Sequence, residues 1–492
     1  MSTSIAFVPC LLALALPHGE GDWPMWRGPQ GHGVGAGKPP TSWSETENLR
    51  WKIEVPGRGL SSPVVCGGKI FLTSAVSKGA PSTAPAAAPA EPAPPAGEGE
   101  GERGGRGGRG GRGGRGGRSA PLVEHEFLVL AYDFENGKEL WRSVAHVQKP
   151  HQGTHPDGSY ATPTPATDGQ VLIASFGSFG IYAYDLAGKA LWNVDLGDMD
   201  VQGGFGEGSS PVIHGENVVI AWDHNGESFV VALDKATGKE RWRKKRESIT
   251  NWTTPVLVEG AGGVQVVIGS STTIAYDLAT GAERWSFGTV VAEAPAQEPA
   301  RGEGEDRGEG GERGGRAGRG PGGPGGGRSG LIATPVESEG VLFFPAGGRR
   351  GSFHAVDLAK AKGVVEQGDA LLWKGANDLP HVPSPIAYDG ILYTLKQNAG
   401  MLSAFDAKTG ERLYGPERMS GFADAYASPV AAGGHLYFSG RDGTFAVVEA
   451  GKSFRLAAIN ELKDQFDASP AVVGDRLLLR GWKHLYCVGA AQ

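Results

Sequence analysis

The sequence predicts an all-β fold, an eight-bladed β-propeller with four-stranded antiparallel blades, because two short elements recur in a turn-rich chain. The first element is Ala-x-Asp, then Gly-Lys or a near equivalent, then Trp, as in residues 131–141 and 183–192. With 81 Gly and 33 Pro in 492 residues, short strands joined by turns are favoured. The second element, Ser/Thr-Pro before apolar runs, starts at Ser62, Thr164, Ser210, Thr254, Thr334, Ser384, Ser428 and Ser469.

A single repeat contains enough strand signals for one blade. Residues 164–167, 171–175, 180–186 and 190–196 are short runs rich in β-branched and aromatic residues, and Gly-containing or polar turns separate them. Four such runs per repeat correspond to one propeller blade.

The two ends of the chain carry complementary parts of the last blade. The eighth repeat supplies three strands, at residues 471–473, 477–479 and 484–488, whereas residues 49–55 with Trp51 form a lone outer strand. Pairing them removes the unpaired edges of an open ring. We therefore expect the N- and C-terminal strands to share one blade of a single domain at residues 20–489.

The repeated aromatic residue is predicted to pack between neighbouring blades. An indole buries about 150–250 Å², enough to contribute substantially to holding adjacent sheets together. The Asp and Gly of the same element are predicted to form the turn before the last strand of each blade. The blade-docking residues are Trp51, Trp141, Trp192, Trp242, Trp285, Trp373 and Tyr414.

Charge and cysteine content exclude several functions. The net charge of -7 and pI of about 6.0 give no basic excess, so DNA is not expected as a partner. Cys10, Cys66 and Cys487 are too far apart for a CxxC metal pair, and the latter two are predicted in strands.

The N-terminus resembles a secretory leader. An apolar run at residues 5–16 precedes Pro17, so residues 1–19 are predicted to direct the chain to the periplasm or another extracytoplasmic location, soluble or peripherally membrane-associated. No Lys or Arg precedes this run, which leaves a loosely ordered N-terminus as the alternative.

Two low-complexity inserts interrupt the repeat, at residues 77–121 and 290–330. The first lies between the second and third strands of blade 1 and the second joins blades 4 and 5, so both are expected on one face. Arginines recur every three residues from Arg103 to Arg118 and could contact a polyanion. No aromatic residue is interleaved for base stacking, so a solvated loop is the favoured interpretation.

The Ala-x-Asp…Gly-x-x-x-Trp element resembles the tryptophan-docking motif of pyrroloquinoline-quinone (PQQ) propellers, a family that also contains BamB-like scaffold proteins. Residues 23–29, Trp-Pro-Met-Trp-Arg-Gly-Pro, resemble the opening of PQQ-binding-like repeat proteins of planctomycete-type bacteria. This resemblance is specific for the fold but not for function.

An active quinoprotein dehydrogenase would, by this resemblance, add a vicinal cysteine disulfide, a calcium ion held by Glu and Asn or Asp, and a catalytic Asp. No cysteines are adjacent here, and no catalytic or metal residue is assigned. We therefore expect a non-catalytic, monomeric scaffold without a cofactor that binds another protein or a cell-envelope component, as in outer membrane assembly. The alternatives are a PQQ- and Ca²⁺-dependent alcohol or sugar dehydrogenase with a divergent pocket, and a polyanion binder acting through the Arg-rich insert.

The predicted binding face is the one that bears the inserts, because it also gathers the irregular links between blades. Its histidines match no established metal-ligand spacing, and its carboxylates are interpreted as turn residues. The candidate residues are His151, His155, Glu207, Trp222, Asp223, His224, Trp252, Arg349, Arg350, His381 and Lys396.

Overall fold

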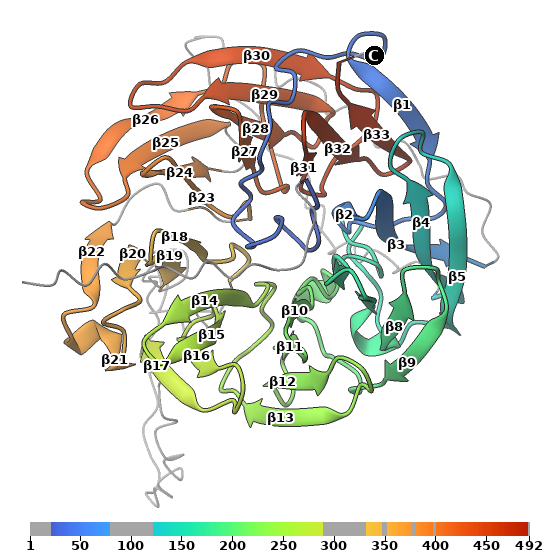
Figure 1. The fold of residues 1–492 in the computed structure, drawn as a ribbon, viewed down its shortest axis with the longest axis horizontal. Coiled ribbons are helices and arrows are strands. Elements are labelled where there is room, and N and C mark those ends of the chain that lie inside the picture. The colour runs from blue at the N-terminus through green and yellow to red at the C-terminus, as the bar shows by residue number, and fades with distance from the viewer. Residues whose placement is uncertain are drawn as a thin grey trace, which may run out of the picture.

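The computed structural model describes residues 21–78, 122–288, 331–346, 352–375, 380, 382–396 and 400–490. These residues form eight sheets arranged as a ring, which confirms the predicted propeller (Figure 1). Most of the leader and the two inserts, together with Arg349, Arg350 and His381, lie outside the described residues. In the described part of the chain, no helix is long and apolar enough to cross a membrane.

The first half of the ring contains blades 1 to 4. Blade 1 comprises β2 (Val64–Cys66), β3 (Lys69–Ser77), β4 (His125–Asp133) and β5 (Glu139–Gln148). Blade 2 comprises β6 (Ala166–Thr167), β7 (Val171–Ser175), β8 (Ile181–Asp185) and β9 (Ala190–Val194), with the 3-10 turn η1 (Gly177–Phe179). Blade 3 follows η2 (Gln202–Gly204) and comprises β10 (Val212–His214), β11 (Asn217–Trp222), β12 (Phe229–Asp234) and β13 (Glu240–Lys245). Blade 4 comprises β14 (Val256–Gly260), β15 (Gly263–Ile268), β16 (Thr273–Asp277) and β17 (Glu283–Phe287).

The second half contains blades 5 to 8. Blade 5 comprises β18 (Val336–Ser338), β19 (Val341–Ala346), β20 (Ser352–Asp357) and β22 (Leu371–Gly375), with β21 (Gly363–Val364) and η4 (Val365–Gln367) between its last two strands. Blade 6 comprises β23 (Ile386–Tyr388), β24 (Ile391–Lys396), β25 (Met401–Asp406) and β26 (Arg412–Arg418). Blade 7 comprises β27 (Val430–Ala432), β28 (His435–Ser439), β29 (Thr444–Glu449) and β30 (Leu456–Glu461). Blade 8 comprises β31 (Ala471–Val473), β32 (Arg476–Arg480), β33 (His484–Val488) and β1 (Leu49–Glu54).

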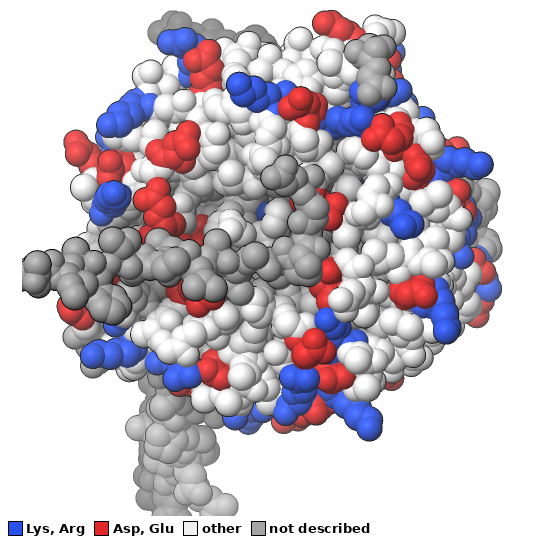
Figure 2. Space-filling view, viewed as in Figure 1, with Lys and Arg blue, Asp and Glu red and all other residues white. Residues whose placement is uncertain are grey.

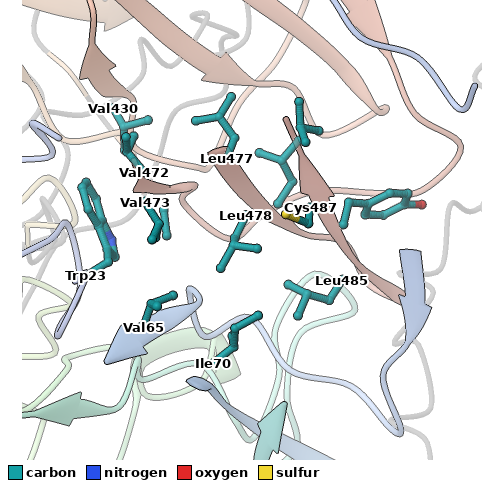
Figure 3. Close-up of a cluster of buried hydrophobic side chains, with 14 of the residues drawn as sticks. Trp23, Val65, Ile70, Val430, Val472, Val473, Leu477, Leu478, Leu485 and Cys487 are labelled. Atoms are coloured by element: carbon teal, nitrogen blue, oxygen red, sulfur yellow. The ribbon is translucent and has the colours of Figure 1, made fainter. Parts of the chain in front are cut away.

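Blade 8 closes the ring as the sequence predicts. The N-terminal strand β1 pairs antiparallel with β33, with Trp51 opposite Cys487 and Glu54 opposite His484. Apolar side chains of blades 7, 8 and 1 pack together at this junction, where Trp23 lies beside Val473 and above Val65 (Figure 3). Both described cysteines are buried in strands, as expected.

A ring of hydrogen bonds joins the blades near the axis. At seven successive junctions, the backbone N–H of the Ser or Thr before the inner strand donates to the side-chain hydroxyl of its counterpart in the next blade. The distances range from 2.9 Å for Ser62 to Thr164 to 3.2 Å for Ser210 to Thr254. We call these residues the hydroxyl ring: Ser62, Thr164, Ser210, Thr254, Thr334, Ser384, Ser428 and Ser469.

The repeated tryptophans join the blades at the outside, as predicted. The indole N–H of Trp192 donates to the Lys235 carbonyl oxygen at 2.8 Å, immediately after Asp234 of the next blade's turn. The same contact, to the residue after the Asp, is made by Trp51, Trp141, Trp242 and Trp373. Each indole also covers the turn glycine that follows, such as Gly238 beneath Trp192.

Blades 4 and 5 meet differently. Trp285 is fully buried, but its indole N–H donates to Gln265 Oε1 within its own blade, at 2.9 Å. The short strand β21, from the extended turn of blade 5, pairs in parallel with β17 and gives blade 4 a fifth strand. In blade 6 the docking position is occupied by Tyr414, whose ring centroid lies 5.9 Å from that of Phe454.

Residues 21–48 cross the centre of the ring (Figure 1) and contact blades 1, 5, 6, 7 and 8. Trp23 forms a β-bridge with Val65 of blade 1, and Val34 forms one with Ala431 of blade 7. The Lys38 N–H donates to the Asp475 carboxylate, in the turn between the first two strands of blade 8, at 2.6 Å. The N-terminal segment therefore covers the face of the propeller that carries the turns between the first and second strands of the blades.

The contact between Trp192 and Gly238 can be tested with a matched pair of glycines. Gly238 and Gly390 have nearly the same positive φ, 71° and 72°, but a Cβ at Gly238 would lie 2.7 Å from the Trp192 ring whereas one at Gly390 would meet nothing within 4 Å. We expect Gly238→Ala to lower the free energy of unfolding by about 1–3 kcal/mol more than Gly390→Ala, measured by denaturant unfolding. Equal losses would contradict a packing role for the indole.

Candidate functional site

The face opposite the N-terminal segment carries the turns between second and third strands and the links between blades. The link before blade 3 brings Glu207 next to Ser178 of η1 in blade 2. The Ser178 N–H donates to Glu207 Oε2 at 2.6 Å, and the Ser178 hydroxyl donates to Oε1. A Cβ at Gly177 would collide with this carboxyl group, so only glycine fits there. The local sequence thus positions one partly buried carboxyl group.

Burial changes the acidity of Glu207. Desolvation raises its pKa from 4.5 to about 7, and the two Ser178 hydrogen bonds and the nearby His151 oppose this shift. A carboxyl group with this pKa can hold or release a proton near neutral pH.

Glu207 lies between two small cavities. The first, about 340 Å³ including space open to solvent, has aromatic walls from Tyr160, Phe176 and Phe179, with His151 at its edge. The second, about 310 Å³, is lined by Glu207, Ser209, Trp222, Asp223 and Asn251. Four sequence-predicted residues, His151, Glu207, Trp222 and Asp223, therefore line these cavities, whereas Ser209 and Asn251 were not predicted.

The second cavity contains two acceptors without partners. The buried Ser209 Oγ and Asn251 Oδ1 form no hydrogen bond among the described residues. Asn251 is held in place through its Nδ2, which donates to the Gly269 carbonyl at 2.7 Å and to Thr253 Oγ1 at 2.8 Å. Oxygen atoms of this kind are suited to a hard cation or to a ligand that donates hydrogen bonds.

Asp223, in the same cavity, is already neutralised. Both of its carboxylate oxygens accept from Arg246, at 2.8 Å from Nε and 3.1 Å from Nη2, and both side chains are buried. This pair raises the pKa of Arg246, although burial alone would lower it. Arg246 also donates to Tyr276 and Ser270, so its donors are directed into blades 3 and 4 and not towards the cavity.

Three of the four candidate histidines lie in the described part of the chain, and each has its own hydrogen-bond or charge partner. His151 Nε2 lies 3.0 Å from the Met199 carbonyl oxygen, and His155 Nδ1 lies 3.7 Å from Asp157. His224 is buried, and its Nδ1 accepts from the Asp200 N–H at 3.0 Å. Within the described ranges, no three His, Cys, Asp or Glu side chains are grouped so that they could hold a metal ion.

An exposed aromatic patch lies beside the first cavity. Phe205, which ends the glycine-rich turn η2, has 53% of its surface exposed. Its ring centroid lies 4.8 Å from that of His155 and 6.3 Å from that of Trp252, whose indole N–H donates to the Gly206 carbonyl. We call these three residues the Phe205 patch: the predicted residues His155 and Trp252 pack on either side of Phe205, which was not predicted. Phe205 was missed because an irregular link between blades has no hydrophobic periodicity from which the exposure of one residue could be predicted.

The remaining candidates are placed elsewhere or buried. Trp222 is fully buried and stacks on Phe229, 5.9 Å away, inside blade 3. Lys396 is exposed at the end of β24 in blade 6, away from the blade 2 and 3 cavities. Figure 2 shows the face that carries the N-terminal segment, and basic and acidic side chains are interspersed around its rim.

The fold and the docking tryptophans define the class of protein, a PQQ-type repeat β-propeller. The family model described as outer membrane protein assembly factor BamB matches residues 115–287 and 227–491, and the chain belongs to this family. No curated protein matches the sequence significantly.

Solved structures resemble the fold at low sequence identity. BamB from Moraxella catarrhalis is 15% identical, with a TM-score of 0.50 over 74% of this chain and 93% of that one. A europium-containing methanol dehydrogenase is 12% identical, with a TM-score of 0.55 over 94% and 90%. A quinohemoprotein alcohol dehydrogenase from Comamonas testosteroni is 12% identical, with a TM-score of 0.54 over 96% and 81%. The likeness spans enzymes and a protein named for assembly, so it shows the fold and leaves the activity open.

The raised pKa of Glu207 gives a pH dependence of stability. Because the folded protein holds this proton more tightly than the unfolded chain, the contribution is present below about pH 4.5 and is lost as the pH rises towards 7. We expect the wild type to lose roughly 3 kcal/mol of unfolding free energy over this range from Glu207 alone. Glu207→Gln should lack this increment, whereas the exposed Glu216→Gln should retain it. The unfolding free energies of both proteins are measured by denaturant unfolding at several pH values. If they change with pH in parallel for the wild type and Glu207→Gln, the raised pKa of Glu207 is excluded.

Proposed function

We propose that this protein is a non-catalytic, extracytoplasmic propeller scaffold that binds another protein through the face opposite its N-terminal segment. The observation that carries this proposal is the Phe205 patch, an exposed aromatic cluster on a link between blades. Exposed aromatic residues that are surrounded by polar groups are typical of the centres of protein interfaces.

Charged residues on the same face complete such a surface. Arg441 pairs with Asp157 at 3.0 Å and with Asp467 at 2.8 Å, and its guanidinium lies 3.8 Å from the centre of the Tyr426 ring. Asp157 is two residues from His155 of the Phe205 patch, so the charged network adjoins the aromatic one. Arginine and tyrosine are both enriched at interfaces, and pre-ordered side chains lose less entropy on binding.

A quinone does not fit the residues around the Glu207 cavities. A tricarboxylate needs cationic groups that are free to bind it, but Arg246 is neutralised by Asp223, and Glu207 adds a potential negative charge. The sequence has no adjacent cysteines to cover such a ring system. These features support a scaffold over a quinoprotein dehydrogenase.

The scaffold proposal is tested by capturing partners from the cell envelope. Phe205→Ser should reduce partner retention on the purified protein by about tenfold or more, as expected when a central aromatic residue of an interface is removed. Leu372→Ser is the matched control, because Leu372 is 41% exposed on the outer strand of blade 5. Equal retention by the wild type and both variants would contradict the proposal.

A dehydrogenase is the second candidate, since Glu207, Ser209 Oγ and Asn251 Oδ1 line one cavity and their oxygen atoms suit a calcium ion. A bound cation would polarise a carbonyl group beside it. We expect calorimetry with Ca²⁺ and PQQ to show no stoichiometric binding of the quinone and no dye-coupled oxidation of alcohols or sugars. Tight binding of both that is lost in Asn251→Ala, with turnover, would overturn the scaffold proposal.

Polyanion binding through the arginines at residues 103–118 stays a prediction, because these residues lie outside the described part of the chain.

A further inference from the structure

The N-terminal segment carries one cation into the interior of the ring. Arg27 is only 1% exposed and has a positive φ of 61°, a backbone conformation that is strained for a residue with a Cβ. The surrounding structure holds it there, since its carbonyl oxygen accepts from the Gly33 N–H at 2.8 Å. Its guanidinium Nη2 donates to the Pro385 carbonyl oxygen, also at 2.8 Å.

These contacts place the guanidinium at the level of the hydroxyl ring. Pro385 directly follows Ser384, a member of the ring. A Cβ at Gly33 would lie 2.8 Å from Arg27 Nη2 and 3.0 Å from the carbonyl oxygen of Pro429, which follows Ser428. Arg27 therefore lies beside the inner ends of blades 6 and 7.

The charge of Arg27 has no counter-charge within the described residues. Its Nε and Nη1 are buried and form no hydrogen bond there. Burial is the only cause acting on its pKa, which it lowers to about 9, so no carboxylate offsets the desolvation. The carboxylate of Glu337, on blade 5, is paired instead with His32 of the same segment, whose Nε2 lies 3.1 Å from Glu337 Oε2.

Burying this guanidinium is costly, because its contacts are limited to the Pro385 carbonyl oxygen and the Trp26 ring, whose centre lies 5.6 Å from the guanidinium carbon. Removing a single ion from water costs several kcal/mol unless another charge or a set of hydrogen bonds compensates. The N–H of Nε and the two N–H groups of Nη1, which have no acceptor among the described residues, add to this cost. The described residues leave this cost uncompensated, so the group that satisfies Arg27 lies outside them.

The hydroxyl ring supplies further donors at this level. Each of its hydroxyl oxygens that accepts a backbone N–H from the neighbouring blade still carries a proton of its own to donate. A guanidinium with two nitrogens that lack acceptors, beside the residues that follow Ser384 and Ser428 of this ring, is complementary to negative charge.

We propose that a small anion, either a monovalent inorganic ion or the carboxylate of a ligand, binds inside the ring beside Arg27. The site is distinct from the Glu207 cavities and from the Phe205 patch, and it does not depend on the proposed scaffold function.

The proposal is tested on the full chain by thermal unfolding at constant ionic strength, with gluconate, a large anion, replaced stepwise by bromide or by acetate. We expect the unfolding midpoint of the wild type to rise by about 2 °C with the small anion. Bromide alone raising the midpoint identifies an inorganic-ion site, and acetate raising it more identifies a carboxylate site. Arg27→Met should abolish either rise, whereas Arg142→Met, on the exposed outer strand β5, should keep it.

Anomalous diffraction from crystals of the wild type soaked in bromide gives a second measurement that does not depend on a variant that folds. A bromide peak beside the Arg27 guanidinium is expected. Ordered water alone at that position, or a rise in midpoint that is equal in the wild type and Arg27→Met, would overturn the proposal.

Discussion

The hydrogen bond between a backbone N–H and the hydroxyl of the next blade is the contact on which the rest of the structure depends. It recurs at seven junctions and fixes where each inner strand begins relative to its neighbour. Proline after each Ser or Thr fixes the backbone of that start and has no N–H of its own to satisfy. With the inner edges aligned in this way, the tryptophans at the outside meet the turn of the following blade, and the links between blades all emerge on one face. Those links carry Glu207 and Phe205.

Sequence reasoning could predict the fold because its determinants repeat. Eight Ser/Thr-Pro starts set the number of blades, and Trp51 ahead of the first start indicated the shared terminal blade. The hydroxyl ring itself was not predicted, because the partner of each N–H belongs to a different repeat and is defined only when the blades are placed side by side. The fifth strand of blade 4 was missed for a related reason. Two residues of β21, within a long turn, have too little periodicity to indicate a strand.

The candidate site was less predictable, since it depends on single residues in irregular links. Topology was sufficient to select the face and to name Glu207, His155 and Trp252. It could not show that Glu207 accepts hydrogen bonds from Ser178, or that Asp223 is neutralised by Arg246, twenty-three positions later. Nor could it show that Phe205 is exposed between His155 and Trp252. Arg27 illustrates the same limit. It belongs to the Trp-Pro-Met-Trp-Arg-Gly-Pro string that carries the family resemblance, but only the path of the chain across the ring shows that its side chain is buried.

That path has a consequence for the order in which the protein is made. Residues 21–48 leave the ribosome before any blade does, yet Arg27 contacts Pro385, 358 positions later, and Lys38 contacts Asp475, 437 positions later. Contacts between such distant parts of a chain are slow to form because a long loop must close first. Residues 21–48 therefore stay without these native partners until blades 6 to 8 have been synthesised.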